Sequence, residues 1–86
     1  MISKILTKKT LSSVARRLKA QGKRIAFTNG TFDILHLGHV TYLQKARASA
    51  DVLIVGVNTD RSVKTYKDPS RPVNPEQDRI KVLAAL

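Results

Sequence analysis

The chain has 86 residues, which is enough for one small domain at most. It contains no cysteine, which excludes disulfides and thiolate metal sites, and no apolar run approaches the roughly 18 residues that span a membrane. Sixteen Lys and Arg against six Asp and Glu invite a nucleic-acid partner, but the four aromatic residues offer little surface for base stacking. The N-terminus also lacks the apolar core of a signal peptide. We therefore expect a cytoplasmic protein with neither a membrane nor a nucleic acid as its main partner.

The first predicted element is a helix that begins after Thr10, a residue suited to the N-cap position. Four apolar residues follow at helical spacing, and Gly22 is placed to end the helix. A short apolar strand is then expected over residues 25–27. The apolar residues that define the helix are Leu11, Val14, Ala15 and Leu18.

A second helix is expected from about residue 39 to 49, followed by a strand over 52–57. This strand is a continuous β-branched run, which is typical of a buried parallel strand. A short helix over 60–66 and a proline-containing loop over 67–73 come next. Asn74 is then predicted to cap a last helix, with Pro75 at its first position and Gln77 completing a capping box. Strand, helix and strand in this order predict an α/β fold, a Rossmann-like parallel sheet with flanking helices.

Two parallel strands are too few for an independent sheet. The chain also stops inside an apolar helical run that has no glycine or basic last turn after it. We therefore expect residues 1–86 to be the N-terminal portion of one domain, truncated after Leu86. The alternative is that a partner chain completes the sheet.

The stretch between the first strand and the second helix holds both histidines of the chain, His36 and His39, with Gly38 between them. Carboxyl ends of strands and N-termini of helices are favoured sites for ligands and phosphate groups. Gly30 and Gly38 remove side chains where a phosphate would approach the backbone closely. Thr31 and Asp33 add a hydroxyl and a carboxylate to the same turn.

Three interpretations of this histidine pair compete. With Asp33 the pair could hold a metal ion, although the zinc-protease spacing is absent. The pair could instead be structural and cap the turn. The third interpretation, which we favour, is phosphate chemistry, in which imidazole N–H groups and backbone amides stabilise charge on a phosphoryl group in transfer.

The run from Gly30 to His39 resembles the H-x-G-H signature of the cytidylyltransferase-like nucleotidyltransferases. The closer resemblance is to the adenylyltransferases of ADP-heptose synthesis, which occur alone or as the second domain of a bifunctional heptose kinase/adenylyltransferase. Further stretches that fit this subgroup are 28–33, 57–60 and 70–74, together with Arg79. The resemblance covers roughly residues 21–86.

The resemblance implies an adenylyltransferase that transfers AMP from ATP to a sugar 1-phosphate and releases pyrophosphate, for a lipopolysaccharide core precursor. It implies Mg²⁺ carried by ATP, no metal held by the protein alone, and a homodimer. The catalytic residues would be His36, His39 and Lys67, although Lys64 matches the lysine segment equally well. Asp33 and Asp60 would bind the substrate. Residues implied in nucleotide and phosphate binding are Asn29, Gly30, Thr31, Phe32, Gly38, Lys64 and Arg79.

The family's second Ser/Thr-rich signature has no match in these residues, so the 86-residue chain by itself is expected to be a poor or inactive catalyst. Within the enzyme class, the alternative is an activity like that of glycerol-3-phosphate cytidylyltransferase. From another class, the alternative is a non-catalytic basic module that binds nucleotides or nucleic acid.

Overall fold

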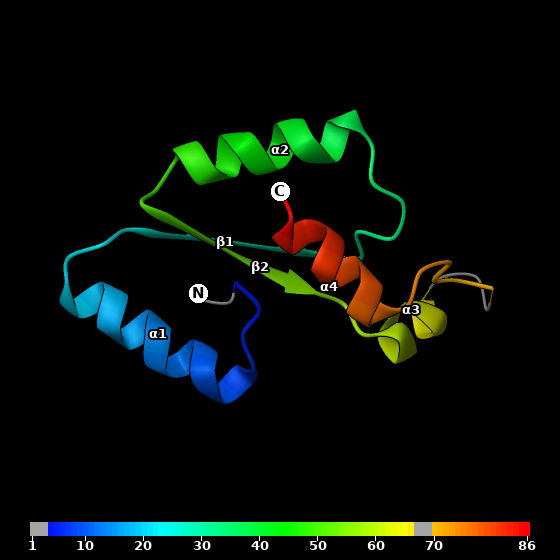
Figure 1. The fold of residues 1–86 in the computed structure, drawn as a ribbon, viewed down its shortest axis with the longest axis horizontal. Helices are drawn as coiled ribbons and strands as arrows, with labels where there is room; N and C mark the ends of the chain where they lie inside the picture. Colours follow the sequence, from blue (N-terminus) through cyan, green and yellow to red (C-terminus); the bar gives the residue numbers. More distant parts are fainter. Residues whose placement is uncertain (1–3, 67–69) are drawn as a thin grey trace.

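The computed structural model describes residues 4–66 and 70–86. Two parallel strands, β1 (Ile25–Gly30) and β2 (Val52–Val57), form the sheet. Figure 1 shows α1 (Lys8–Ala20) on one side of these strands and α2 (Leu37–Ala48) on the other. Two further helices follow β2, namely α3 (Asp60–Tyr66) and α4 (Glu76–Ala84). The expected α/β architecture, with a parallel sheet and flanking helices, is confirmed.

The first helix begins earlier than its sequence pattern predicts. Its N-cap is Thr7, whose hydroxyl accepts a hydrogen bond from the backbone N–H of Thr10 at 3.2 Å. The prediction that Thr10 caps this helix is therefore wrong, because a second threonine three residues earlier satisfies the same orphan N–H. Gly22 follows the helix with φ +76°, the left-handed conformation in which glycine ends helices without strain.

The parallel register pairs Ile25 with Val52 and Gly30 with Val57. The first strand is longer than predicted, because Thr28 and Asn29 continue the ladder despite their polar side chains. The second strand and the short helix α3 have the predicted bounds. Both strands end at the same edge of the sheet, which places the turn after β1 beside the segment after β2.

The last helix begins one residue later than predicted, because its N-cap is Pro75 and no side chain of its own segment caps it. The side-chain amide of Asn74 instead donates to the backbone carbonyl of Asp33 at 2.8 Å. The cap comes from another helix, since the Glu76 N–H donates to Oδ1 of Asp60 at 2.8 Å. In return, the Asp60 N–H donates to Oε1 of Glu76 at 3.2 Å. The first residues of α3 and α4 thus cap each other, an arrangement that no local motif predicts.

Few side chains are deeply buried among the described residues. Phe32 is 6% exposed, Val63 is fully buried and Arg79 is 1% exposed. All three lie near the carboxyl ends of the strands. The best-packed part of the molecule therefore surrounds the turn that carries the signature, which fixes the position of this turn.

Candidate functional site

The turn after β1 is built around Phe32, which has φ +52°. This left-handed conformation is uncommon for a residue other than glycine and costs of order 1–3 kcal/mol. The buried Phe32 ring offsets part of this cost, and it lies 5.8 Å from the His39 ring, centroid to centroid. The side chain of Phe32 thus packs against His39, and its predicted contact with a nucleotide stays a prediction.

The two histidines lie against each other at the start of α2, with ring centroids 4.1 Å apart and an interplanar angle of 51°. His36 is the N-cap, and its Nδ1 accepts the backbone N–H of Gly38 at 3.0 Å. Nδ1 of His39 accepts the backbone N–H of His36 at 3.2 Å. The pair is therefore a capping box made of two imidazoles, and the structural role considered from sequence is real.

These hydrogen bonds also assign the ring protons. A neutral imidazole whose Nδ1 accepts carries its proton on Nε2, which makes Nε2–H the donor that each ring can offer to a ligand. Burial lowers the pKa of His39 below its ordinary value, and the neighbouring His36 adds to this shift. The His39 ring is consequently neutral at neutral pH. Capping and phosphate binding are compatible, because they use different nitrogens.

The glycines of the signature make room for side chains of the protein itself. A Cβ at Gly38 would lie 2.7 Å from Cε1 of His36, and a Cβ at Gly30 would lie 3.1 Å from Cε2 of Phe32. These contacts give a packing reason for both glycines, and the approach of a phosphate to their backbone stays a prediction. Gly38 allows the His36 ring to lie over the first turn of α2, and Gly30 allows the Phe32 ring to pack against the end of β1.

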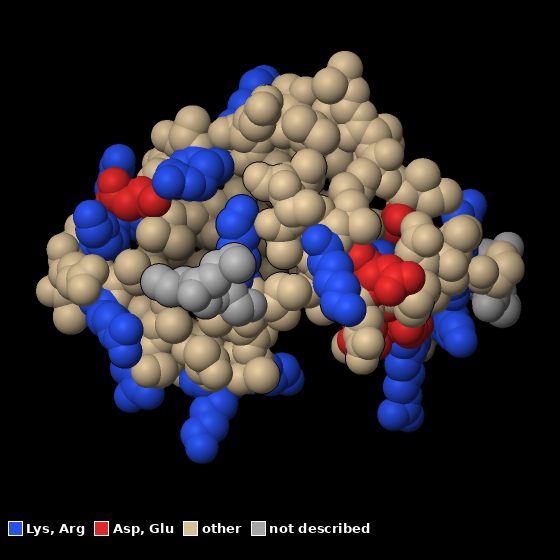
Figure 2. All heavy atoms as spheres, viewed as in Figure 1, with Lys and Arg blue, Asp and Glu red and all other residues tan. Residues whose placement is uncertain are grey.

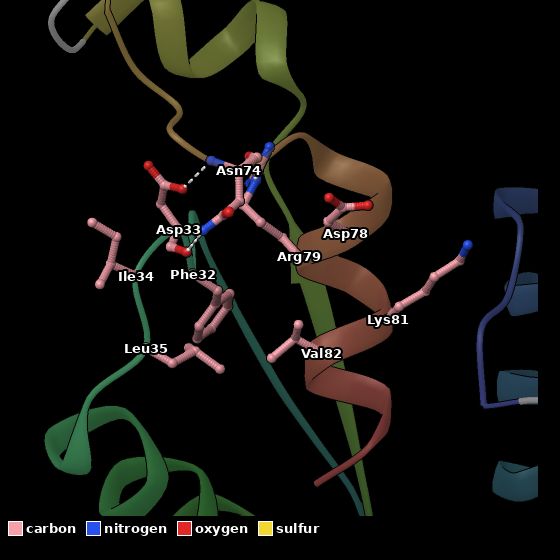
Figure 3. Close-up of a pocket in the computed structure, with 9 residues that line it drawn as sticks. All are labelled: Phe32, Asp33, Ile34, Leu35, Asn74, Asp78, Arg79, Lys81 and Val82. Carbon is pink, nitrogen blue, oxygen red and sulfur yellow. Dashed lines mark hydrogen bonds between the residues drawn. The ribbon is translucent and has the colours of Figure 1, made fainter.

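Asp33 fastens this turn to the segment that precedes α4. Its carboxylate accepts the backbone N–H groups of Val73 at 2.7 Å and of Asn74 at 2.8 Å, and Asn74 faces it in Figure 3. Burial acts to raise the pKa of Asp33, but these two N–H groups and the charges of Arg71 and Arg79 outweigh it, so the pKa lies below its usual range. Asp33 is therefore an ionised clasp, and its predicted substrate contact stays a prediction.

Arg79 joins three segments from a buried position. Its Nη1 donates to the Thr31 carbonyl at 2.6 Å, its Nη2 to Oδ1 of Asp60 at 2.7 Å, and its Nε to the Asn74 carbonyl at 3.0 Å. The predicted phosphate-binding role of Arg79 stays untested, but these contacts are structural. The same holds for Asp60, whose Oδ1 accepts from Arg79 and also caps α4. One buried guanidinium thus sets the position of the turn relative to β2 and α4.

Two open hollows flank the turn. One, of about 420 Å³, is lined by Thr31, Phe32, Asp33, Ile34, His39 and Arg71. It combines an imidazole, a hydroxyl and an exposed guanidinium, a set of donors suited to an anion. The other hollow, of about 470 Å³, lies between the turn and α4 and has Ile34, Leu35 and Val82 among its walls (Figure 3). The first hollow is therefore the candidate place for the phosphate chemistry expected from sequence, which stays a prediction.

The remaining predicted residues are dispersed. Asn29 is exposed near the end of β1, Lys64 is exposed on α3, and Lys67 lies outside the described residues. Sequence reasoning gave no site role to Arg71. This residue lines the 420 Å³ hollow that contains His39, here called the histidine hollow, and its Nη1 lies 3.9 Å from Oδ2 of Asp33. It also missed Asn58, whose side-chain amide donates to the Thr31 hydroxyl at 3.3 Å. The signal for Asn58 was its position, since it directly follows β2 as Thr31 directly follows β1.

A metal centre is not assembled by the described residues, since they contain no group of three or more His, Cys, Asp or Glu side chains placed to hold an ion. The carboxylates of Asp33 and Asp60 accept backbone N–H groups. No helix within residues 4–66 and 70–86 is long and apolar enough to span a membrane.

A family model described as cytidylyltransferase-like matches residues 27–86, which include the turn, both histidines and the Arg79 contacts. The chain belongs to the cytidylyltransferase-like family. This membership agrees with the parallel sheet and with the histidine pair at the start of α2, and it places the chain among proteins of the nucleotidyltransferase type.

Curated relatives extend the similarity to nearly the whole chain. The chain is 62% identical to the bifunctional protein HldE of Nitratiruptor over 73 residues, which are 85% of this chain and 16% of that protein. It is 55% identical to HldE of Methylobacillus flagellatus over 83 residues, 96% of this chain and 17% of the relative. HldE of Vibrio parahaemolyticus is 50% identical over 82 residues, 95% of this chain and 17% of the relative. The chain therefore spans less than a fifth of the length of these relatives.

Proposed function

We propose that this chain carries the catalytic histidines of an adenylyltransferase that acts on ATP and a sugar 1-phosphate, heptose 1-phosphate in the first instance. The observation that supports this most is the capping box of His36 and His39. It turns the Nδ1 atoms inward and leaves two Nε2–H donors at a helix N-terminus, beside a hollow that holds a guanidinium. The choice of sugar and nucleotide rests on the resemblance to the adenylyltransferases of ADP-heptose synthesis, and the similarity to the bifunctional HldE proteins supports the nucleotidyltransferase class.

The proposed reaction is a single in-line displacement. An oxygen of the sugar 1-phosphate attacks the α-phosphorus of ATP, the bond to the β-phosphate oxygen breaks, and pyrophosphate leaves with that electron pair. The nucleotide enters as its Mg²⁺ complex, in which the ion neutralises part of the phosphate charge. His36 and His39 donate from Nε2 to the charge that develops on the α-phosphate, and Arg71 adds a cation at the rim.

The helix dipole of α2 and its first backbone N–H groups favour the same negative charge. Because His39 is neutral, it donates a hydrogen bond without the cost of holding a cation at a positive helix end. Either Lys64, on α3, or Lys67 is proposed to reach over the phosphates.

The remaining expectations belong to the same proposal. The chain is the N-terminal portion of a nucleotidyltransferase domain, and the active protein is a cytoplasmic homodimer that supplies a lipopolysaccharide core precursor. The 86 residues without the rest of that domain are proposed to be inactive. The alternatives are a cytidylyltransferase that acts on glycerol 3-phosphate and a non-catalytic nucleotide-binding module.

The test is pyrophosphate release by the full-length gene product, with ATP and CTP each offered against heptose 1-phosphate and glycerol 3-phosphate. Release only with ATP and the heptose would support the proposal, whereas release with CTP and glycerol phosphate would keep the mechanism and change the substrates. Silence from all four pairs in a folded protein would favour the non-catalytic module. A matched variant is Gln44→Ala on the exposed side of α2, which should keep full activity, while His39→Ala should lose it.

A further inference from the structure

The positive charge of this chain is strongly segregated, and the proposed reaction does not use most of it. Residues 1–24 hold eight of the sixteen Lys and Arg and none of the six Asp and Glu. The rest of the chain is close to balanced. The histidine pair, Arg71 and Arg79 all lie in that second part, so the basic segment contributes no residue to the lining of the candidate site.

The structure displays this charge on an exposed face. The apolar stripe of α1 packs toward β1, which turns the polar side of the helix outward. Figure 2 shows blue side chains projecting from the region of α1, with the red ones lying elsewhere in this view. We define the basic face by its exposed members, which are Lys4, Lys8, Lys9, Arg16, Arg17 and Lys19.

Among the described residues, the ion pair that neutralises a cation of residues 1–24 lies at the C-terminal end of this segment. Within residues 4–66 and 70–86, the carboxylate that pairs with a cation of the segment is Asp51, whose Oδ2 lies 3.7 Å from Nε of Arg24. The six members of the basic face form no ion pair with any carboxylate in the part of the chain that the structure describes. Six uncompensated cations on one side of a small domain create an attractive field for an extended polyanion.

Two large aliphatic side chains accompany these cations. Ile5 is 43% exposed and Leu6 is 40% exposed, and both lie between Lys4 and Lys8. Phosphates of a nucleic acid gain nothing from exposed aliphatic groups, and the basic face has no aromatic residue on which a base could stack. A bilayer surface satisfies both features, because lipid headgroups attract the lysines while the acyl boundary buries the aliphatic side chains.

We propose that the basic face, together with Ile5 and Leu6, binds the surface of an anionic lipid bilayer. Such peripheral binding needs no spanning helix, and it departs from the sequence-based expectation that the protein has no membrane partner. It does not depend on the proposed reaction. The α1 side of the domain would lie on the headgroups, and the histidine hollow, which is built from residues after β1, would stay open to soluble substrates.

The test is co-sedimentation of the full-length gene product with vesicles of phosphatidylcholine, with and without about 30% phosphatidylglycerol. Each cation near such a surface contributes about fivefold in affinity at low ionic strength. The triple variant Lys8→Gln/Lys9→Gln/Arg17→Gln should therefore bind about 100-fold more weakly. The matched control Lys45→Gln/Arg61→Gln/Lys81→Gln removes the same charge from α2, α3 and α4, and it should bind within about fivefold of the unmodified protein.

A second variant, Ile5→Ser with Leu6→Ser, separates lipid from nucleic acid. It should weaken vesicle binding about tenfold and leave any retention on duplex DNA unchanged. The proposal is overturned if the unmodified protein does not bind anionic vesicles at low salt, or if the two triple variants bind them equally. Tight, steeply salt-dependent binding to duplex DNA without vesicle binding would also overturn it and assign the basic face to nucleic acid.

Discussion

Replacing Arg79 by methionine tests whether one buried guanidinium holds the candidate site together. Methionine keeps much of the side-chain volume, so the change removes polar interactions rather than opening a large cavity. The variant cannot form the hydrogen bonds to the Thr31 carbonyl, the Asn74 carbonyl and the Asp60 carboxylate, which measure 2.6–3.0 Å. Removing one partner of a buried pair typically costs about 3–5 kcal/mol. The Asp60 side chain is 33% exposed and can be rehydrated, so we expect the lower end, about 3 kcal/mol.

Two further variants sharpen this expectation. In Arg79→Lys a single ammonium replaces a planar fork and cannot reach three acceptors, so a loss of about 2 kcal/mol is expected. Arg61→Met is the matched control, because Arg61 is exposed on α3, and it should change stability by less than about 0.5 kcal/mol.

The measurement is urea denaturation of the full-length gene product, followed by far-UV circular dichroism. Amide hydrogen exchange over residues 30–36 reports locally on the turn and should accelerate in both Arg79 variants. If both variants unfold at the same urea concentration as the Arg61 control, with exchange over the turn unchanged, then Arg79 does not fix the site and the argument from its three hydrogen bonds is refuted.

Four other predictions concern the histidines, Gly38 and the Asp33 carboxylate. His36→Ala and His39→Ala should each lower turnover by roughly 10²–10³-fold with secondary structure retained, and near-normal turnover in both would remove their assigned role. The folded-state pKa of His39 lies below its ordinary value of 6.5, so the unfolded chain takes up the proton first as the pH falls. The stability of the folded protein should therefore be intact above pH 6.5 and decrease as the pH drops below that value. The variant His39→Asn should lack this pH-dependent component in a pH series of denaturation curves. Gly38→Ala places a Cβ 2.7 Å from His36 and should lower turnover at least about tenfold, whereas Gly22→Asn, at φ +76° with open space, should keep it; equal turnover would contradict the packing argument. Asp33→Asn keeps one acceptor of two and should cost about 1–2 kcal/mol near neutral pH. Since the pKa of Asp33 is lowered from 3.8, this difference should vanish only as the pH falls through that lowered value, and a difference that persists in stronger acid would argue against the clasp.

Much of the fold follows from local pattern. The β-branched run of β2 and the apolar stripe of α1 predict their elements, because side-chain periodicity depends on the chain itself. The signature between β1 and α2 likewise predicts where a ligand would bind, because the first backbone N–H groups of a helix have no partner within the helix and can bind an anion. Helix starts were harder to predict, as Thr7 and Pro75 show, because neighbouring residues compete for the same orphan N–H groups.

The sequence by itself determined the family, the two histidines and the edge of the sheet at which they lie. Tertiary structure alone decided what the polar residues around them do. Asp33, Asp60 and Arg79 have the side chains of a binding site, but their partners lie up to 48 residues away along the chain. All of these hydrogen-bonding partners except the Asn74 carbonyl, which accepts from Arg79, are at least 16 residues distant, so only folding brings them together. A buried charge or carboxylate takes the nearest donors and acceptors that the fold supplies, so its role depends on distances that local sequence does not contain.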